Sequence, residues 1–246
     1  MDKPFLSIII PAHNEEHRLP HTLETLFAYL DAQPYSSEVW VVENGSQDRT
    51  LQLAQELSRR YRRLYVLHEE ERGKGLAVRR GMLAARGEYR MMCDADLSMP
   101  PYEIGRFLPP QLSGVDIAIA SREAPGAKRY HEPLLRHWIG RAFNLLIRLL
   151  VLPQFHDTQC GFKCFTAAAA ERLFPLQTIT GWTFDVEILY LATRLKMRIQ
   201  EVPIQWYFNP ESKVHIGRDS IRMALDLLYI RSHWRSFPGA KKDFGK

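Results

Sequence analysis

Short apolar runs alternate with amphipathic segments along the first part of the chain. The run Phe5–Ile10 is dominated by β-branched residues, which favours a strand, and leucines then recur at helical spacing from Leu19 to Leu30. The same order is repeated, with predicted strands and helices at 38–42, 50–61, 64–67 and 76–85. A fourth apolar run, Tyr89–Cys93, follows. This alternation predicts an α/β fold, in which a mostly parallel sheet is flanked by helices on both faces.

The second half of the chain is less regular, although the same two patterns recur. Strands are predicted at 116–120 and 199–206, a short loop and strand at 159–165, and helices at 134–152, 167–173, 184–196 and 219–233. No linker rich in Pro, Gly or Ser separates these elements from the first half. We therefore expect a single domain over residues 1–238, followed by a tail at 239–246.

Polar residues follow several of the predicted strands at the points where those strands end. In a parallel α/β sheet the ligand site lies beyond the carboxyl ends of the strands. The residues at these points are Pro11, Glu43, Asn44, Lys74, Asp94 and Asp96. We expect them to gather on one rim of the sheet and to form a ligand site there.

The sequence Asp94-Ala95-Asp96 places two carboxylates directly after an apolar strand. Side chains two residues apart in an extended segment lie on one face, so both can contact one divalent cation and a diphosphate. An isolated Asp-x-Asp is also compatible with a turn or a helix cap. The apolar run before it and the Pro100-Pro101 break after it favour the cation site.

The loop Arg72-Gly73-Lys74-Gly75 is typical of a segment that brings backbone N–H groups to a phosphate at a helix N-terminus. It lacks the remainder of a P-loop, which disfavours nucleotide hydrolysis of that type. The loops 11–15 and 43–50 are compatible with nucleotide contacts, and equally with ordinary turns and helix caps.

The charge balance favours an anionic ligand. The chain has 33 Lys and Arg against 28 Asp and Glu, a net charge of +5, which suits phosphates, nucleic acid or an anionic membrane surface. Nucleic acid is disfavoured, because aromatic residues are not interleaved with a basic stripe. No apolar run reaches the roughly 18 residues that a membrane span requires, so we expect none.

The predicted helix 134–152 is amphipathic. His137, Arg141, Asn144 and Arg148 recur at intervals of four, three and four residues and form one polar stripe on an otherwise apolar helix. Such a helix can lie on a membrane surface with its arginines at lipid phosphates, or it can be buried in the protein on most sides. Composition alone leaves both interpretations open.

The loops together resemble the inverting family 2 glycosyltransferases with a GT-A fold, and within them the polyprenyl-phosphate sugar synthases, including the dolichyl-phosphate mannose synthases. The segments that carry this resemblance are Ser7–Glu16, Val41–Ser46, Arg72–Gly75 and Asp94–Leu97. Two further segments, Asp157–Lys163 and Gly181–Glu187, are more specific and resemble the dolichyl-phosphate β-glucosyltransferase branch.

The resemblance implies a nucleotide-sugar site with Mg²⁺ or Mn²⁺ in the half 1–115. Asp96 is expected to ligate the metal, and Asp94 to contact the ribose or the water shell of the metal. Ser98 stands where mannosyl-type relatives have a Gln ligand. The donor nucleotide is expected between Pro11, His13, Glu15, Glu43, Asn44 and Lys74, although Glu43-Asn44 stands where Asp-Asp is common.

The half 116–238 is then expected to bind the acceptor. Arg122 and Arg136 match arginines that grip an acceptor phosphate in similar synthases, and Lys213 and Arg218 resemble a basic loop that closes over the same phosphates. Asp185 stands where relatives with hydroxyl acceptors have their base. The residues expected to carry the reaction are Asp96, Arg122, Arg136 and Asp185.

The reaction implied by the resemblance is metal-dependent transfer of glucose from UDP-glucose to a polyprenyl, dolichyl-type phosphate, with inversion. GDP-mannose as donor and a soluble or protein hydroxyl as acceptor are the alternatives within enzymes. A noncatalytic nucleotide-sugar or nucleic-acid binding module is the alternative outside them. We expect a cytoplasmic protein, peripheral at the cytoplasmic face of a membrane, acting there alone or with a separate membrane protein.

Overall fold

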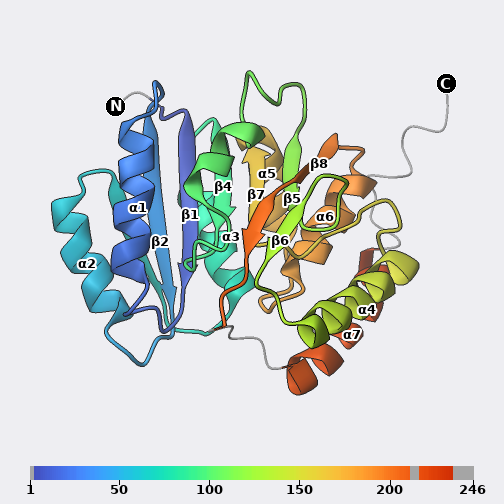
Figure 1. Ribbon diagram of the computed structural model, residues 1–246. Helices are drawn as coiled ribbons and strands as arrows, with labels where there is room; N and C mark the ends of the chain where they lie inside the picture. Colours follow the sequence, from blue (N-terminus) through green and yellow to red (C-terminus); the bar gives the residue numbers. More distant parts are fainter. Residues whose placement is uncertain (1–2, 211–215, 235–246) are drawn as a thin grey trace.

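A computed structural model describes residues 3–210 and 216–234, and its centre is a seven-stranded sheet with the strand order β3-β2-β1-β4-β7-β5-β8 (Figure 1). β7 runs antiparallel to β4 and β5, and the other neighbouring strands are parallel. The predicted mostly parallel mixed sheet is therefore confirmed. Its strands are β1 (Leu6–Ala12), β2 (Ser37–Asn44), β3 (Leu64–Glu69), β4 (Tyr89–Cys93), β5 (Ile117–Ser121), β7 (Phe162–Thr166) and β8 (Ile199–Pro203).

Helices cover both faces of the sheet, as alternation along the strands requires. In β1, Ile8 packs in one apolar core and Ile9 in the other, because successive side chains of a strand point to opposite faces. The first face is covered by α1 (Leu19–Asp31), α2 (Thr50–Arg60) and η1 (Pro101–Phe107). The second is covered by α3 (Lys74–Ala84), α5 (Ala167–Leu173), η2 (Phe174–Leu176) and α6 (Phe184–Arg194).

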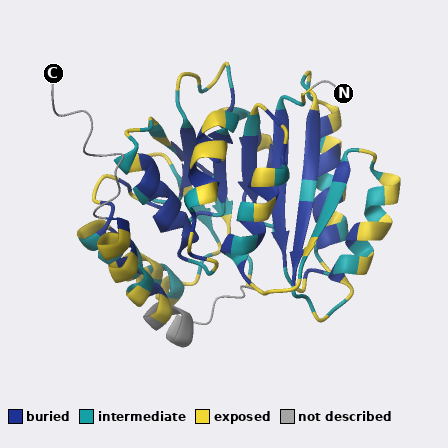
Figure 2. Cartoon of the chain, turned by 180° about the vertical axis from the view of Figure 1, so that it is seen from behind, coloured by how far each residue is buried: buried dark blue, intermediate teal, exposed yellow. Residues whose placement is uncertain are grey.

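Two further helices, α4 (Leu134–Leu150) and α7 (Ile216–His233), lie side by side at one corner of the molecule (Figure 1). Only one residue of α4, Ile147, is buried, and Figure 2 shows that most of this helix is exposed or half-buried. The interpretation of this segment as a helix buried on most sides is therefore excluded.

The segment 199–206, predicted as one strand, is divided in the structure. β8 ends at Pro203, which has no N–H to continue the hydrogen-bonded ladder. The next residues form β9 (Gln205–Tyr207), which pairs in parallel with β6 (Lys128–Tyr130) as a separate two-stranded sheet. β6 spans only three residues, too few to give a periodic pattern in the sequence. The predicted tail at 239–246 lies outside the described residues.

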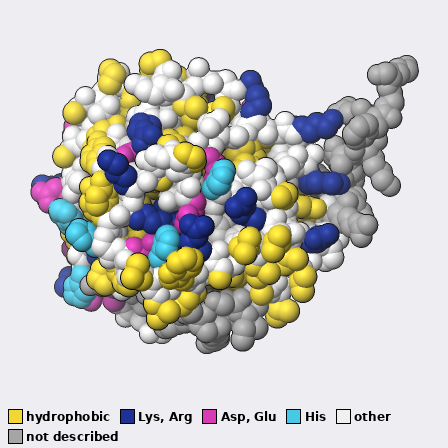
Figure 3. Space-filling view, turned by 45° about the vertical axis from the view of Figure 1, so that its right-hand side comes forward, with side chains coloured by type: hydrophobic (Ala, Val, Ile, Leu, Met, Phe, Trp, Pro, Cys, Tyr) yellow, Lys and Arg dark blue, Asp and Glu magenta, His cyan; other side chains and the backbone are white. Residues whose placement is uncertain are grey.

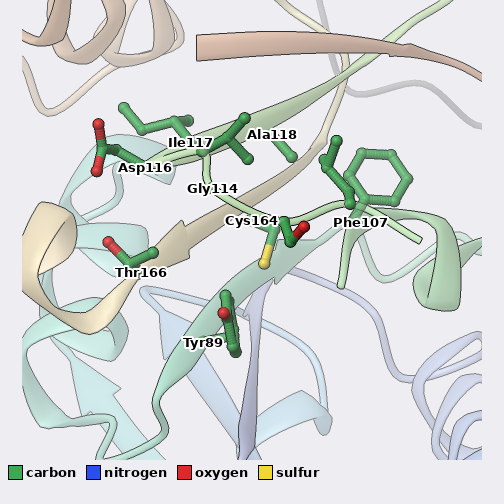
Figure 4. A pocket seen from close by; sticks show the side chains of 11 residues that line it. Tyr89, Phe107, Gly114, Asp116, Ile117, Ala118, Cys164 and Thr166 are labelled. Atoms are coloured by element: carbon green, nitrogen blue, oxygen red, sulfur yellow. The ribbon is translucent and has the colours of Figure 1, made fainter. Parts of the chain in front are cut away.

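The pockets at the two ends of the strands differ in size. At the amino end of β4, a pocket of about 10 Å³ lies between Tyr89, Asp116 and the buried Cys164 (Figure 4). This space suffices for about one water molecule. A much larger cleft lies at the opposite end of the strands, beyond the carboxyl ends of β1, β2, β4 and β5.

Candidate active site

The large cleft has a volume of about 720 Å³ and is bounded by residues from both halves of the chain. Figure 3 shows basic, acidic and histidine side chains gathered in the middle of one face of the molecule, with hydrophobic side chains beside them. Most of the predicted site residues line the cleft: Pro11, His13, Glu15, Asn44, Lys74, Asp94, Asp96, Ser98, Arg122, Arg136 and Asp185. The structure thus brings predicted site residues from both halves of the chain into one cleft.

The two carboxylates after β4 are held by different partners. Asp94 Oδ1 lies 2.6 Å from Lys74 Nζ, and Asp96 Oδ1 accepts a hydrogen bond of 3.0 Å from the backbone N–H of Ser98. The chain turns at Leu97, between Asp96 and Ser98, and the φ of Leu97, 49°, is in the left-handed region. Burial and the neighbouring Asp94 raise the pKa of Asp96, because both disfavour a second negative charge.

The same residues fit a divalent cation. Within residues 3–210 and 216–234, no three His, Cys, Asp or Glu side chains converge on one point. The protein could therefore offer the Asp94 and Asp96 carboxylates and the Ser98 hydroxyl, leaving the other ligand positions to phosphate oxygens and water. This is the arrangement that Mg²⁺ prefers beside a diphosphate.

Gly161 sets how closely the second half of the chain approaches this pair. It immediately precedes β7, which begins on the same rim because it runs against β4. A Cβ atom added at Gly161 would lie 1.7 Å from Asp94 Oδ2, so the Asp94 carboxylate would have to move aside. Glycine at this position therefore lets Asp94 adopt its place in the cleft.

Lys74 begins α3 and is fixed by contacts from the loop before α6. Cβ atoms added at Gly73 and Gly75 would lie 2.7 Å from the carbonyl oxygens of Thr180 and Ile179, so the two segments touch through their backbones. The Lys74 ammonium lies 5.4 Å from the centroid of the Trp182 ring. Burial alone would lower the pKa of Lys74, but the carboxylates of Asp94 and Asp185 raise it, so this lysine stays charged.

The first two loops are joined by hydrogen bonds at the end of the cleft. His13 Nδ1 donates to the carbonyl oxygen of Asn44 at 2.8 Å, and Asn44 Nδ2 donates to that of Ala12 at 3.1 Å. Asn44 Oδ1 also accepts from the backbone N–H of Gly73 at 3.2 Å. Asn44 thus ties β1, β2 and the loop before α3 into one wall.

Glu43 is the predicted donor-site residue that the structure places outside the cleft lining. It is buried, and its carboxylate accepts from the Ser46 N–H and contacts His68 Nδ1, each at 2.5 Å. Because Asn44 is the next residue in the strand, its side chain points the other way and lines the cleft. Glu15 does line the cleft, where it forms an ion pair of 2.6 Å with Arg18.

Asp185, at the start of α6, forms a buried ion pair. Its carboxylate lies 2.9 Å from Nζ of Lys163, which also donates to the carbonyl oxygen of Cys160 at 2.7 Å. Burial raises the pKa of Asp185, while the two lysines Lys163 and Lys74 oppose this shift. Lys163 belongs to the segment Asp157–Lys163 that carried the family resemblance, but its role was not predicted.

Arg122 follows β5 and is bound by a residue of the same segment. Its Nε and Nη2 donate to the two carboxylate oxygens of Asp157 at 2.7 and 3.0 Å. Burial would raise the pKa of Asp157, but the Arg122 guanidinium lowers it to about 2. The fork of Arg122 therefore grips a protein carboxylate, and the guanidinium also lies 5.4 Å from the centroid of the Trp206 ring.

The other acceptor-side cations differ in what surrounds them. Arg136 lies over the Phe208 ring at 5.0 Å and lines the cleft. Arg129 lies 5.9 Å from the Trp206 ring and was missed in the sequence, although Glu132 three residues later is a sign of an ion pair. Lys213 and the side chain of Arg218 lie outside the described residues.

The described lining of the whole cleft contains seven Lys and Arg side chains and eight Asp and Glu side chains, a net charge of about −1 with histidines neutral. This contrasts with the net charge of +5 for the chain. A divalent cation held in this cleft would change that net charge from about −1 to about +1.

An exposed apolar surface borders the cleft; we call it the α4/α7 surface. It is formed by Leu134, Leu135, Trp138, Leu145 and Leu149 of α4 and by Leu225, Leu228 and Tyr229 of α7. Two residues of the polar stripe of α4 contact the protein: His137 contacts Glu132, and the half-exposed Arg141 contacts Glu123. No helix in the described part of the chain is long and apolar enough to cross a bilayer.

Comparisons with known proteins agree with this architecture. A dolichyl-phosphate β-glucosyltransferase of Trichomonas vaginalis is 36% identical over 250 residues, covering 95% of this chain and 76% of that protein. One of Drosophila melanogaster is 37% identical over 262 residues, covering 97% and 79%. Glucosyl-3-phosphoglycerate synthase from Mycobacterium tuberculosis, solved with Mn²⁺, UDP-glucose and phosphoglyceric acid, superposes with a TM-score of 0.67 at 19% identity, covering 93% and 80%.

The comparison with this solved structure concerns the fold alone. Together with other solved synthases of the same fold, it confirms the predicted single GT-A domain. The family model for glycosyl transferase family 2 matches residues 7–174, which include every residue from Pro11 to Gly161 that lines the cleft. The resemblance seen in the sequence is therefore confirmed, and the chain belongs to glycosyl transferase family 2.

Proposed function

We propose that this protein transfers glucose from UDP-glucose to a polyprenyl, dolichyl-type phosphate, with inversion and with Mg²⁺ or Mn²⁺. The observation that carries the proposal is the single cleft, which joins the Asp94–Asp96 pair to an arginine-rich side that borders the α4/α7 surface. The names of the relatives described above support glucose as the sugar and dolichyl phosphate as the acceptor.

In this proposal the half 1–115 binds the donor. Pro11, His13, Glu15 and Asn44 line the base end of the cleft, and Glu43 acts from beneath by fixing the turn at Ser46. Asp94, Asp96 and Ser98 would hold the metal, which neutralises the diphosphate and makes it a better leaving group. Lys74 adds a fixed positive charge beside Asp94, at the position where the leaving diphosphate gains charge.

The half 116–238 would place the acceptor. A phosphate oxygen attacks the anomeric carbon of glucose on the face opposite the diphosphate, a new carbon–oxygen bond forms, and the bond to the diphosphate breaks. A phosphate is already anionic near neutral pH, so the reaction needs no strong base. Arg136 and Arg122 would orient the phosphate, with Lys213 and Arg218 closing over it.

Asp185 is held by the ammonium of Lys163 at 2.9 Å, and burial raises the pKa of its carboxyl group. A phosphate acceptor is already anionic and gives up no proton as it attacks, so the proposed reaction does not need Asp185 as a general base. We therefore assign Asp185 the role of holding the donor sugar hydroxyls, or of organising the site charges, and not that of a base.

The α4/α7 surface supports a position at a membrane. Leucines and a tryptophan on adjacent helices favour the boundary between headgroups and acyl chains. Ile139, Phe143 and Met223 of the same two helices line the cleft and would let a lipid chain pass from it toward that surface. We propose a peripheral protein at the cytoplasmic face of a membrane, acting alone or with a separate membrane protein.

The decisive experiment incubates the full chain with polyprenyl phosphate and a panel of sugar nucleotides, in the presence of Mn²⁺, Mg²⁺ or a chelator, and identifies products by mass. The proposal expects glucosyl phosphoprenol from UDP-glucose, and none with the chelator. Mannolipid from GDP-mannose would replace the donor assignment. Glucose found only on soluble hydroxyl compounds would replace the acceptor, and absence of any glycolipid would refute the function.

Membrane binding is tested separately by sedimentation with phospholipid vesicles. Replacing both Trp138 and Leu149 by Ser should release the protein from vesicles, because both side chains are exposed in the α4/α7 surface. Leu83→Ser is the matched control, since Leu83 is an exposed leucine of α3, outside that surface. Equal vesicle binding by both variants would refute the assignment of the surface.

A further inference from the structure

Arg129 has its whole guanidinium engaged by protein oxygens inside the cleft. Its Nη1 contacts Glu132 Oε2 at 2.6 Å, its Nη2 contacts the carboxylate of Glu123, and its Nε donates to the carbonyl oxygen of Arg122 at 3.2 Å. All four residues line the cleft. Carboxylates thus occupy the positions on Arg129 that phosphate oxygens would take, since both anions bind a guanidinium through the same fork.

The two carboxylates are also tied to α4, and they belong to a side of the cleft without surplus positive charge. Glu132 contacts His137 at 3.1 Å and Glu123 contacts Arg141 at 3.3 Å. The described cleft lining within residues 116–238 holds four arginines and five carboxylates. A phosphate entering this side therefore meets no surplus of positive charge.

We propose that Glu123 and Glu132 are specificity-determining residues that reject free phosphate and soluble phosphate compounds from the acceptor side. The inference rests on the proposed function, because it concerns the acceptor of that reaction. A free phosphate must displace a carboxylate from Arg129 and then remain beside it, which costs affinity. A phosphate carrying a lipid chain gains compensating contacts with apolar residues of the same cleft, such as Ile139 and Phe143.

A purely structural role for the two glutamates makes a different prediction. If they served only to anchor α4, removing a charge would loosen the helix and would weaken ligand binding or leave it unchanged. If they repel anions, removing one charge strengthens the binding of inorganic phosphate. Glu→Gln separates the two roles, because the amide oxygen can still accept from Arg129 while the charge is lost.

The test measures binding of inorganic phosphate by calorimetry at constant ionic strength, with thermal unfolding as a check of folding. For Glu132→Gln and for Glu123→Gln we expect the Kd of phosphate to fall by about tenfold, the size expected for removal of one partly buried like charge. Adding Arg129→Gln to Glu132→Gln should abolish the gain. Glu171→Gln is the control for loss of a glutamate charge. Glu171 lies on α5, outside the cleft lining, and contacts Arg90 at 2.5 Å, so this variant should leave the Kd of phosphate unchanged.

Unchanged or weaker phosphate binding in both folded glutamate variants would overturn the inference, and so would an equal gain in Glu171→Gln. Glycolipid formation, assayed in parallel, separates this result from the proposed function. Glycolipid formation without a gain in phosphate binding refutes the inference alone. A gain in phosphate binding without glycolipid formation by the wild type supports charge rejection at this site and refutes the proposed acceptor.

Discussion

The donor and acceptor sides of the cleft handle charge in opposite ways. On the donor side, Asp96 has a backbone N–H as its partner, and Asp94 shares its charge with Lys74. On the acceptor side, Arg122 is matched by Asp157, and Arg129 by Glu123 and Glu132. The Asp96 carboxylate on the donor side is therefore placed to take a cation, whereas Arg122 and Arg129 on the acceptor side are already matched by carboxylates.

This difference bears on how each side would select its ligand. A carboxylate such as that of Asp96 repels a nucleotide diphosphate until a cation binds it, so we expect the metal to decide donor binding. A balanced site gains little from bringing in a bare anion, so the rest of the acceptor must supply affinity. Variants that change one side at a time can test this comparison.

The largest effect is expected on the donor side. Asp96→Asn removes the carboxylate assigned to the metal, and we expect turnover to fall by about a thousandfold, since metal coordination supplies several kcal/mol of charge stabilisation. Mn²⁺ titration of donor binding should show the same loss. Asp31→Asn, at the exposed end of α1, is the control and should leave turnover and Mn²⁺-dependent donor binding unchanged. Undiminished turnover in Asp96→Asn would exclude Asp96 as the metal ligand.

A smaller loss is expected where the two sides meet. Gly161→Ala would force Asp94 Oδ2 away from its place, because the added Cβ would lie 1.7 Å from it. Displacing a reacting group by about 1 Å can cost about a hundredfold in rate, and we expect a loss of that order in kcat. Gly140→Ala lies in the same cleft with open space around it, and it should keep its kcat. Equal kcat values for the two variants would contradict the contact.

The Arg122–Asp157 pair of the acceptor side should contribute to the free energy of unfolding in a way that depends on pH. The pKa of Asp157 is about 2 in the folded protein, against its ordinary value of 3.8, so the Arg122 pair stabilises the fold above about pH 4 and loses this contribution as the pH falls toward 2. Its pH-dependent part amounts to about 2 kcal/mol. Guanidinium unfolding of wild type and Asp157→Asn should therefore differ most near neutrality and converge on acidification. A difference that is constant with pH would contradict the ionised pair.

The donor side could be predicted from the sequence because its signals are local. Each strand end there carries its own residue, as with Asn44 and Asp96, and parallel strands bring those ends to one rim. The acceptor side depends on contacts between distant segments. Arg129 is oriented by carboxylates before and after it, and the short strand β6 that carries it has no periodic signal.

The partners of the ion pairs could not be predicted from the sequence for the same reason. Arg122 and Lys163 were visible as cations, but their partners Asp157 and Asp185 lie 35 and 22 positions away along the chain. Only the folded sheet brings them together, with β7 inserted between β4 and β5. Amphipathicity of α4 was visible, but the sequence did not separate the apolar residues that pack on the core, such as Ile147 and Phe143, from those left exposed, such as Trp138.

The smallest predicted effect concerns the link between the two sides. Glu187 on α6 is buried and accepts from Thr178 and Ile179, the loop that seats α3 and Lys74, and also from Trp234 Nε1 at 3.0 Å. Trp234 follows α7, whose residues Arg222 and Asp226 line the acceptor side. One carboxylate thus connects α7 to the loop behind the donor lysine.

Trp234→Phe keeps an aromatic ring and removes that one donor. We expect it to lower the free energy of unfolding by at least about 1.5 kcal/mol, because it removes a hydrogen bond to a charged group and also leaves part of the buried indole site unfilled. If the link transmits position, the KM for the donor should also rise by about twofold to threefold while kcat stays constant, because Lys74 would be less firmly seated. Trp138→Phe, on the exposed face of α4, is the matched substitution for stability and should change it by less than about 0.5 kcal/mol. Lower stability with an unchanged donor KM would mean that the bond holds α7 in place without reaching the donor site, and the two sides would then be independent across Glu187.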